Sequence, residues 1–401
     1  MELSIPDQRP RQDALIIALV GFIHGTSHFF HLLVPSLFPW LMPEFGLDFT
    51  RIGVSMTVFF IVSACGQALA GFLVDRFGAV RVLLAGMCCF LLSGCVLALA
   101  GGLPGILVAA TLAGLGNSVL HPADFTLLNR RVSTSRLGHA FSVHGLSGNL
   151  GWALAPVLLT GIAAVGGWRL ASVLAGLMAL PAIFLLLWFR GLLDVAPVTA
   201  EQSGEKTGQL AFLGEGAVWL CFAFFFLITA AFGAVQNFMP SLLQGMYGMP
   251  LALSAASLSI YMLASGGGIV VGGFVARHAA HERQIAAALS VAALLAIVMA
   301  SAVVPAALVP VLLAGIGFFS GIAGPSRDLL VRKAATSRFG QAAYGRVYGF
   351  VYSGLDLGLA AAPLIFGGFM DRVHFSAVLI GIAAFQSLAI LTALRVGRSG
   401  T

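Results

Sequence analysis

Three histidines in the first long apolar segment have both the residue type and the spacing to do chemistry: His24, His28 and His31. Steps of four and three residues place them on one face of a helix. Imidazole changes charge near neutral pH and could exchange protons with a passing solute, and three imidazoles could also bind a transition metal. Hydrogen bonding between packed helices is the structural alternative. We predict that this face lines a polar path, and we assign no metal site from the sequence.

A second set of polar residues, Asn117, His121 and Asp124, repeats this spacing in a later apolar segment. An aspartate inside a helix of hydrocarbon length is a functional candidate by default. Pro122 lacks a backbone donor and should bend the helix at this point. We predict that Asp124 accepts a proton and that His121 tunes it; a structural ion pair near the cytoplasmic end is the alternative.

Polar side chains in the second half of the chain could face the same path. Arg327 corresponds to Asp124 in an internal repeat, so the two could pair across the seam between the halves; alternatively Arg327 pairs with its neighbour Asp328. Asp356 is either a second protonatable site or a partner for a neighbouring helix. The expected lining in this half is Gln236, Asn237, Arg327, Tyr352 and Asp356.

The composition places these residues in a membrane protein. Of the 401 residues, 59% are hydrophobic and only 9% are charged, whereas soluble domains carry about 25% charged residues. The net charge of +6 does not indicate nucleic-acid binding, because the basic residues cluster in alternate short loops. The five cysteines all lie in apolar runs without a C-x-x-C pair, which favours small core residues over disulfides.

Twelve apolar segments are long enough to cross a bilayer. They are residues 13–40, 50–74, 80–101, 104–129, 139–165, 168–190, 215–244, 251–276, 283–304, 306–331, 341–369 and 375–395. With both termini in the cytoplasm, all of the 21 lysines and arginines except Arg51, Arg169 and Arg372 fall on the cytoplasmic side. This positive-inside distribution predicts an all-α multi-pass protein of the bacterial inner membrane with both ends inside.

The two halves of the sequence repeat one another. His24, His28, His31 and Pro35 correspond to Thr229, Gly233, Gln236 and Pro240, and Ser147-Gly148 corresponds to Ser353-Gly354. The polar stretch 191–214 separates the halves and is expected to be a cytoplasmic linker between bundles at 1–190 and 215–401. Related six-helix halves are typical of transporters that alternate access around a central site.

The loop after the second segment carries a recognisable motif. Its glycines, aspartate and arginines are Gly71, Asp75, Arg76, Gly78 and Arg81. This pattern resembles the loop motif of the major facilitator superfamily, and the resemblance implies twelve helices in two pseudo-symmetric six-helix bundles. It also implies a latch that forms and breaks as the bundles move; an ordinary positive-inside loop is the alternative.

A narrower resemblance is to the fosmidomycin-resistance type of drug exporters. It is carried by the pair His121-Pro122 and by the run Gly148, Asn149, Gly151, Ala153, Leu154 and Pro156. That family often has a glutamate shortly after the His-Pro pair, where this chain has Ala123 and Asp124. The resemblance implies export of a small organic compound driven by proton exchange.

The sequence therefore predicts a proton-coupled secondary transporter, not an enzyme, that moves a small polar or amphipathic solute. Its partners would be that solute, protons and the lipid bilayer, with no nucleic acid, no cofactor and a monomeric state. No phosphate-binding glycine loop followed by Lys-Ser or Lys-Thr is present, so nucleotide-driven pumping is not indicated. Proton-coupled import of a polar solute or metal chelate remains the alternative, and an intramembrane enzyme is a remote one.

Overall fold

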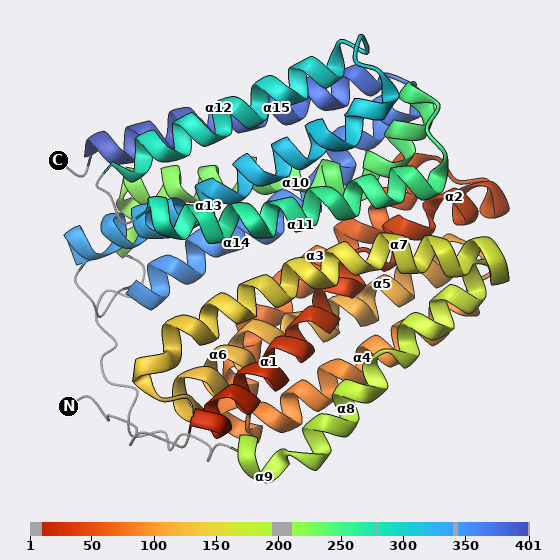
Figure 1. Cartoon of the computed structure of the whole chain (residues 1–401). Coiled ribbons are helices and arrows are strands. Elements are labelled where there is room, and N and C mark those ends of the chain that lie inside the picture. The colour runs from red at the N-terminus through yellow and green to blue at the C-terminus, as the bar shows by residue number, and fades with distance from the viewer. Residues whose placement is uncertain (1–9, 195–210, 277–279, 340–343, 400–401) are drawn as a thin grey trace. The chain divides into compact units, whose positions relative to one another are not determined.

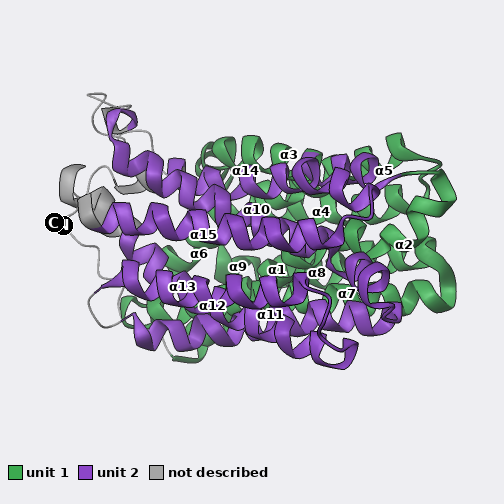
Figure 2. Ribbon diagram, turned by 90° about the horizontal axis from the view of Figure 1, so that it is seen from above, with its two compact units in different colours: residues 1–47, 58–204 green, residues 48–57, 205–401 purple. Residues whose placement is uncertain are grey.

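The computed structural model describes residues 10–194, 211–276, 280–339 and 344–399, and every regular element in these ranges is helical. The chain folds into two compact units (Figure 2). Unit 1 holds residues 1–47 and 58–204, and unit 2 holds residues 48–57 and 205–401. Most of the expected linker at 191–214 falls on residues 195–210, which lie outside the described residues.

Unit 1 begins with the histidine-bearing helix (Figure 1). Its elements are α1 (Pro10–His31), α2 (Leu33–Phe45), most of α3 (Phe49–Phe77), α4 (Ala79–Ala98), α5 (Leu103–Ser118), α6 (Leu120–Arg131), η1 (Thr134–Arg136), α7 (Leu137–Leu177), α8 (Ala179–Trp188) and α9 (Arg190–Leu193). Helix α1 packs along α7, and α4 packs against α5, α7 and α8.

Unit 2 repeats this arrangement with longer uninterrupted helices. Its elements are η3 (Ala211–Gly214), α10 (Gly216–Tyr247), α11 (Leu251–Val275), α12 (His281–Ala300), η4 (Ala306–Leu308), α13 (Val309–Phe339), α14 (Tyr344–Asp371) and α15 (Phe375–Ser399). Helix α10 packs along α14 as α1 packs along α7, and α12 packs against α15 as α4 packs against α8. The internal repeat of the sequence is therefore also a repeat of helix pairings within each unit.

The described helices account for the expected twelve spans. Eleven of them are long and apolar enough to cross a membrane, and one of these covers 55 residues, Thr134–Trp188. Such a helix would be about 80 Å long, far more than the roughly 30 Å of hydrocarbon. Gly167 interrupts it with φ 79° and ψ 164°, a backbone that favours glycine. The interruption divides Thr134–Trp188 into two spans, at the boundary that the sequence predicts between 165 and 168.

Close approach of backbones explains why glycines recur where helices cross. A Cβ at Gly151 of α7 would overlap the carbonyl oxygen of Gly25 on α1. In the second unit, a Cβ at Gly358 of α14 would overlap the carbonyl oxygen of Phe226 on α10. Small residues at helix crossings let membrane helices pack closely. The crossing of α1 and α7 holds the histidine face against α7.

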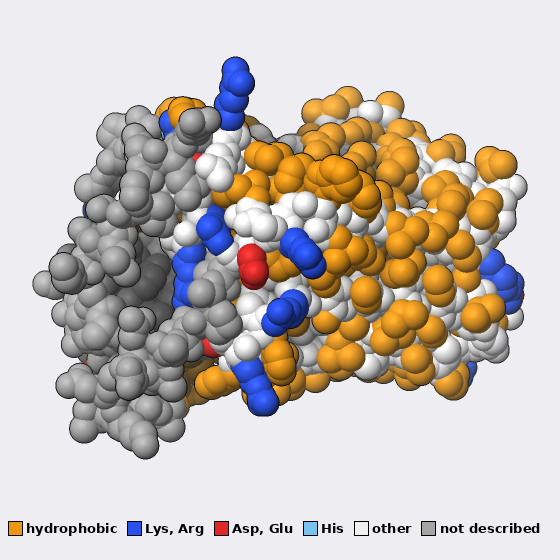
Figure 3. Space-filling model, turned by 90° about the horizontal axis from the view of Figure 1, so that it is seen from below, with side chains coloured by type: hydrophobic (Ala, Val, Ile, Leu, Met, Phe, Trp, Pro, Cys, Tyr) orange, Lys and Arg blue, Asp and Glu red, His pale blue; other side chains and the backbone are white. Residues whose placement is uncertain are grey.

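Apolar side chains cover much of the face shown in Figure 3, apart from the part drawn in grey. Phe72, Phe184, Trp188 and Leu294 are each more than half exposed. In a soluble protein such an extended apolar surface would be unusual, but lipid-facing helices require it. The surface thus supports the membrane assignment made from composition.

A buried carboxylate anchors the beginning of α1. Asp13 is fully buried and accepts hydrogen bonds from Ser133 Oγ at 2.6 Å and Arg136 Nη1 at 2.8 Å. Asp13→Ala would leave both donors without this acceptor, which typically costs about 1–3 kcal/mol. We expect a lower midpoint of thermal unfolding in detergent. Ser142→Ala is the control, because that exposed hydroxyl bonds only within its own helix; equal effects of the two variants would contradict the anchor.

Candidate functional site

The candidate site lies inside unit 1, where three helices bring polar side chains together. Helix α1 contributes His24 and His28, α6 contributes His121 and Asp124, and α7 contributes His144. The α5–α6 boundary falls at Val119, three residues before Pro122, whose ring conflicts with the carbonyl of the residue four positions earlier. The helix is therefore interrupted just before Pro122, at the place where the sequence predicts a bend.

Asp124 is the centre of the site. Its side chain is fully buried, and its Oδ2 lies 3.1 Å from Nε2 of His144 and 3.4 Å from Nδ1 of His24. The first contact is a hydrogen bond, and the second is at ion-pair distance. Asp124 Oδ1 has no hydrogen-bond partner within the described ranges. The rings of His24 and His144 stack with centroids 3.5 Å apart, so the carboxylate faces two adjoining imidazoles.

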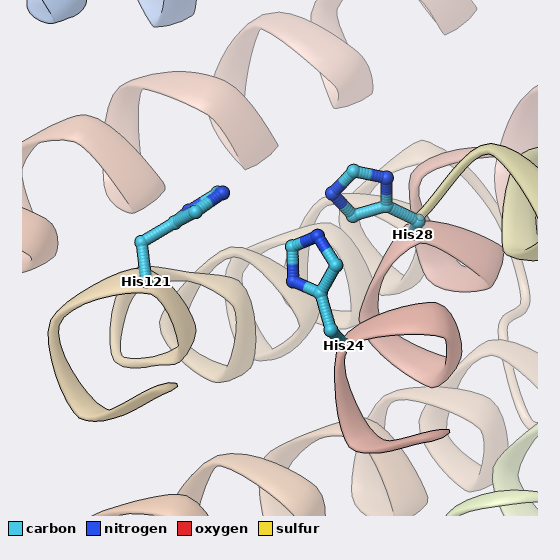
Figure 4. Close-up of side chains that lie close together, drawn as sticks. All are labelled: His24, His28 and His121. Carbon is cyan, nitrogen blue, oxygen red and sulfur yellow. The ribbon is translucent and has the colours of Figure 1, made fainter. Parts of the chain in front are cut away.

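His28 and His121 extend this cluster beyond the carboxylate (Figure 4). The ring centroid of His24 lies 4.3 Å from that of His28 and 5.2 Å from that of His121. His28 also stacks on Trp152 of α7 with centroids 4.2 Å apart. Two of the three predicted α1 histidines therefore meet the predicted α6 residues, and we refer to His24, His28, His121, Asp124 and His144 as the imidazole–carboxylate cluster.

The third predicted histidine, His31, belongs to a different polar network. Its Nε2 lies 2.9 Å from Oδ1 of Asn117, which also accepts a hydrogen bond of 2.6 Å from Ser27 Oγ. The amide of Asn117 donates to Ser63 Oγ at 2.8 Å. Because a carbonyl oxygen can only accept, His31 donates from Nε2. Asn117 thus connects α1, α3 and α5.

This network gives a prediction about stability. Asn117→Ala would leave His31, Ser27 and Ser63 without their shared partner inside a buried region. Each unsatisfied buried group typically costs about 1–3 kcal/mol, so we expect a clearly lower unfolding midpoint in detergent. Thr111→Val on the same helix is the control, because the hydroxyl of Thr111 bonds only to Leu107 of that helix. Identical midpoints for Asn117→Ala and wild type would contradict the network.

The predicted residues of unit 2 do not gather around one point in the same way. Arg327 pairs with its neighbour Asp328 at 2.9 Å, and the hydroxyl of Tyr352 donates to the same carboxylate at 3.3 Å. Arg327 therefore makes the local pair that the sequence offered as the alternative, and its pairing with Asp124 stays a prediction. Asp356 is 8% exposed and forms no ion pair with any of the described residues.

Two amides of α10 are buried in unit 2. Asn237 donates to the carbonyl of Gly233 at 2.7 Å, which holds its side chain against its own helix. The amide nitrogen of Gln236 is buried without a hydrogen-bond partner within the described ranges. Of these two predicted lining residues, Gln236 keeps an unused donor.

The loop motif lies at the junction of α3 and α4. Gly71, Asp75, Arg76 and Arg81 are exposed, and Gly78 has φ 84°, a conformation that glycine adopts without strain. The backbone N–H of Gly78 donates to the carbonyl of Val74 at 2.8 Å and ends α3. The motif therefore makes a tight turn between two spans, and its role as a latch stays a prediction.

Sequence reasoning missed His144 and Trp152, two of the side chains that shape the site. His144, Gly148 and Trp152 follow one another at intervals of four on α7, so they share a helix face. Gly148 opens that face, because a Cβ there would overlap the ring of His28. The spacing alone predicts that these residues share a helix face. Only the packing of α7 against α1 shows that this face contacts the histidines of α1.

Comparison with known proteins agrees with the fold. The sequence profile of the Major Facilitator Superfamily matches residues 17–344, and the chain belongs to this superfamily. It is therefore a membrane transporter rather than an enzyme, with the twelve-helix, two-bundle fold that its sequence predicts.

Individual relatives place the chain within that superfamily. It is 34% identical to the fosmidomycin resistance protein of Escherichia coli over 174 residues, which is 42% of each chain. It is 26% identical to an uncharacterized transporter of the same superfamily from Bacillus subtilis, over 94% of this chain and 92% of that one. A bacterial homologue of the human lysosomal transporter Spinster, solved in an inward-facing and occupied conformation, superposes with a TM-score of 0.77 at 12% identity over 98% of both chains.

Proposed function

We propose that this transporter exports a small polar or amphipathic organic compound in exchange for protons across the inner membrane of a bacterium. The observation that carries the proposal is the fully buried carboxylate of Asp124 between His144 and His24. An export role is further supported by the similarity to a protein named for fosmidomycin resistance. The same proposal places both termini in the cytoplasm and the polar stretch 191–214 as the linker between bundles at 1–190 and 215–401.

The cluster has the chemistry that proton exchange requires. An ionised carboxylate buried in an apolar interior is costly unless it is paired. One proton shared among Asp124, His144 and His24 gives either a neutral acid beside neutral rings or a paired imidazolium and carboxylate. The 3.1 Å separation of His144 Nε2 and Asp124 Oδ2 is a hydrogen-bond path for that proton.

Coupling also requires that solute and proton favour different access states. We assign solute contacts to polar groups outside the proton pair: His31 with Asn117 in unit 1, and Gln236 with its unused amide in unit 2. Asp356 is assigned as a second protonatable group. The latch role is assigned to the exposed Asp75, Arg76 and Arg81 of the loop motif.

The proposal is tested with purified protein in liposomes that contain a pH-sensitive dye. Fosmidomycin is the first probe solute, followed by a panel of polar and amphipathic compounds. We expect a solute gradient to drive proton movement in the opposite direction, and a pH gradient to drive solute accumulation. Solute and proton moving in the same direction would contradict export by exchange, and solute flux indifferent to the pH gradient would contradict coupling.

A further inference from the structure

Three imidazoles from two helices converge in unit 1 in a way that proton exchange at Asp124 does not require. His24, His28 and His121 each place one ring nitrogen within 4.8 Å of the others. Figure 4 shows the two α1 rings beside one another and the His121 ring reaching toward them from α6. His24 is 2% exposed and His28 is 8% exposed. The sequence alone could not indicate this triad, because it joins residues about a hundred positions apart.

One ring nitrogen each of His24 and His28 lies close to Gly148. Nδ1 of His28 is buried and has no hydrogen-bond partner in the described part of the chain. A Cβ at Gly148 would overlap this Nδ1 atom of His28 and would lie 3.1 Å from Nε2 of His24. A glycine at this position therefore leaves space beside two ring nitrogens. Buried polar atoms in native proteins are normally hydrogen-bonded, so a buried ring nitrogen without a partner calls for a structural or functional explanation.

The geometry points to a binding site for one divalent transition-metal ion of the zinc class, held by His24, His28 and His121. Neutral imidazole is a preferred ligand of such ions, and three histidines with an open fourth position form a known type of zinc site. Zinc–nitrogen bonds of about 2.0–2.1 Å place tetrahedral ligand atoms about 3.3 Å apart. On binding the ion, the ring nitrogens would have to approach one another by roughly 1.5 Å or less from the 4.8 Å limit, through rotation of the side chains.

Asp124 is positioned to orient one of these ligands. Its Oδ2 lies 3.4 Å from Nδ1 of His24, the nitrogen on the other side of the ring from Nε2. A hydrogen bond from this nitrogen to the carboxylate would fix the tautomer in which Nε2 offers its lone pair to the metal, as in many carboxylate–histidine–zinc arrangements. The negative charge of Asp124 also offsets part of the charge of the ion. The inference concerns ion binding and does not depend on the proposed coupling to protons.

His31 lies outside this site although it shares the helix face. Its Nε2 is engaged with Asn117, and it is absent from the set of nitrogens that approach one another. Magnesium and calcium are not the expected ions, because they prefer oxygen ligands. The proposed site therefore has three histidine ligands, without His31, and is expected to bind a transition-metal ion rather than magnesium or calcium.

The test uses full-length protein in detergent, stripped with a chelator and titrated with Zn²⁺ by calorimetry and with Co²⁺ by visible absorption. We expect one ion per chain and the absorption bands of a four-coordinate cobalt site with nitrogen ligands. His28→Gln and His121→Gln should each weaken binding by about tenfold or more. His139→Gln is the matched control, because that histidine is exposed on α7, and it should leave the affinity unchanged.

A second pair of variants tests the geometry without removing a ligand. Gly148→Ala places a methyl group against His28 and should weaken Zn²⁺ binding by at least about tenfold. Gly145→Ala, one turn away with no neighbouring atom within 4 Å, should not. Absence of saturable one-to-one binding by the wild-type protein, or a cobalt spectrum without four-coordinate bands, would overturn the inference. Unchanged affinity in correctly folded His28→Gln or Gly148→Ala would overturn it as well.

Discussion

Asp124→Asn is expected to abolish accumulation of solute driven by a pH gradient while leaving a folded protein. The amide has nearly the same size as the carboxyl and can still meet His144, 3.1 Å away in the wild type, but it cannot gain or lose the proton. Exchange of labelled solute across liposomes without a gradient should persist, because it needs no net proton movement. The measurement compares gradient-driven uptake with exchange in the same preparation.

Two comparisons make this result specific. Asp194→Asn removes an exposed carboxylate at the end of α9 and should leave gradient-driven uptake at the wild-type rate. His144→Ala removes the hydrogen-bonded partner of Asp124 and should lower uptake by about 10–100-fold, because a hydrogen bond to a charged group contributes about 1.5–3 kcal/mol. If Asp124→Asn accumulated solute as wild type does, Asp124 would not carry the coupling proton.

Gly151→Ala is expected to have a large effect although it removes no polar side chain. Its methyl group would overlap the carbonyl oxygen of Gly25 on α1, so the two helices must separate. Overpacking of a close contact typically costs about 1–3 kcal/mol. Gly25 directly follows His24, so displacement of α1 also moves the imidazole–carboxylate cluster. We expect a lower unfolding midpoint in detergent and loss of transport.

Gly161→Ala is the matched control on the same helix. A methyl group at Gly161 would have no neighbouring atom within 4 Å, so alanine there should be neutral or slightly stabilising, since alanine favours helix more than glycine does. Equal unfolding midpoints for the two alanine variants would show that the crossing of α1 and α7 is looser than the structure describes. Retained transport by Gly151→Ala would show that the imidazole–carboxylate cluster does not depend on the close crossing of α1 and α7.

The spans and their repeat could be predicted because membrane helices leave strong, local signals. A run of about 20 apolar residues marks a span, and Gly167 and Pro122 mark where helices break or bend. The shared face of His24 and His28 follows from helical periodicity alone. These features depend on residues close together in the sequence, so a single sequence contains enough information to predict them.

The composition of the site could not be predicted in the same way, because it depends on which helices pack together. Nothing in the periodicity of α1 distinguishes His31 from His28, yet in the structure Asn117 lies beside His31 and the ring of His121 lies near that of His28. His144 lies in the site because Gly25 and Gly151 allow α7 to approach α1 closely. The local pairing of Arg327 with Asp328 likewise depends on side-chain conformation rather than on spacing.

The central claim is that Asp124 is a carboxyl group that exchanges its proton inside unit 1. The most direct measurement is infrared difference spectroscopy of the protein in lipid between two pH values, which detects the C=O stretch of a protonated carboxyl. We predict a pH-dependent band in the wild type that loses intensity in Asp124→Asn and keeps it in Asp194→Asn. A band of unchanged intensity in Asp124→Asn, or no protonated-carboxyl band at any pH, would contradict the account.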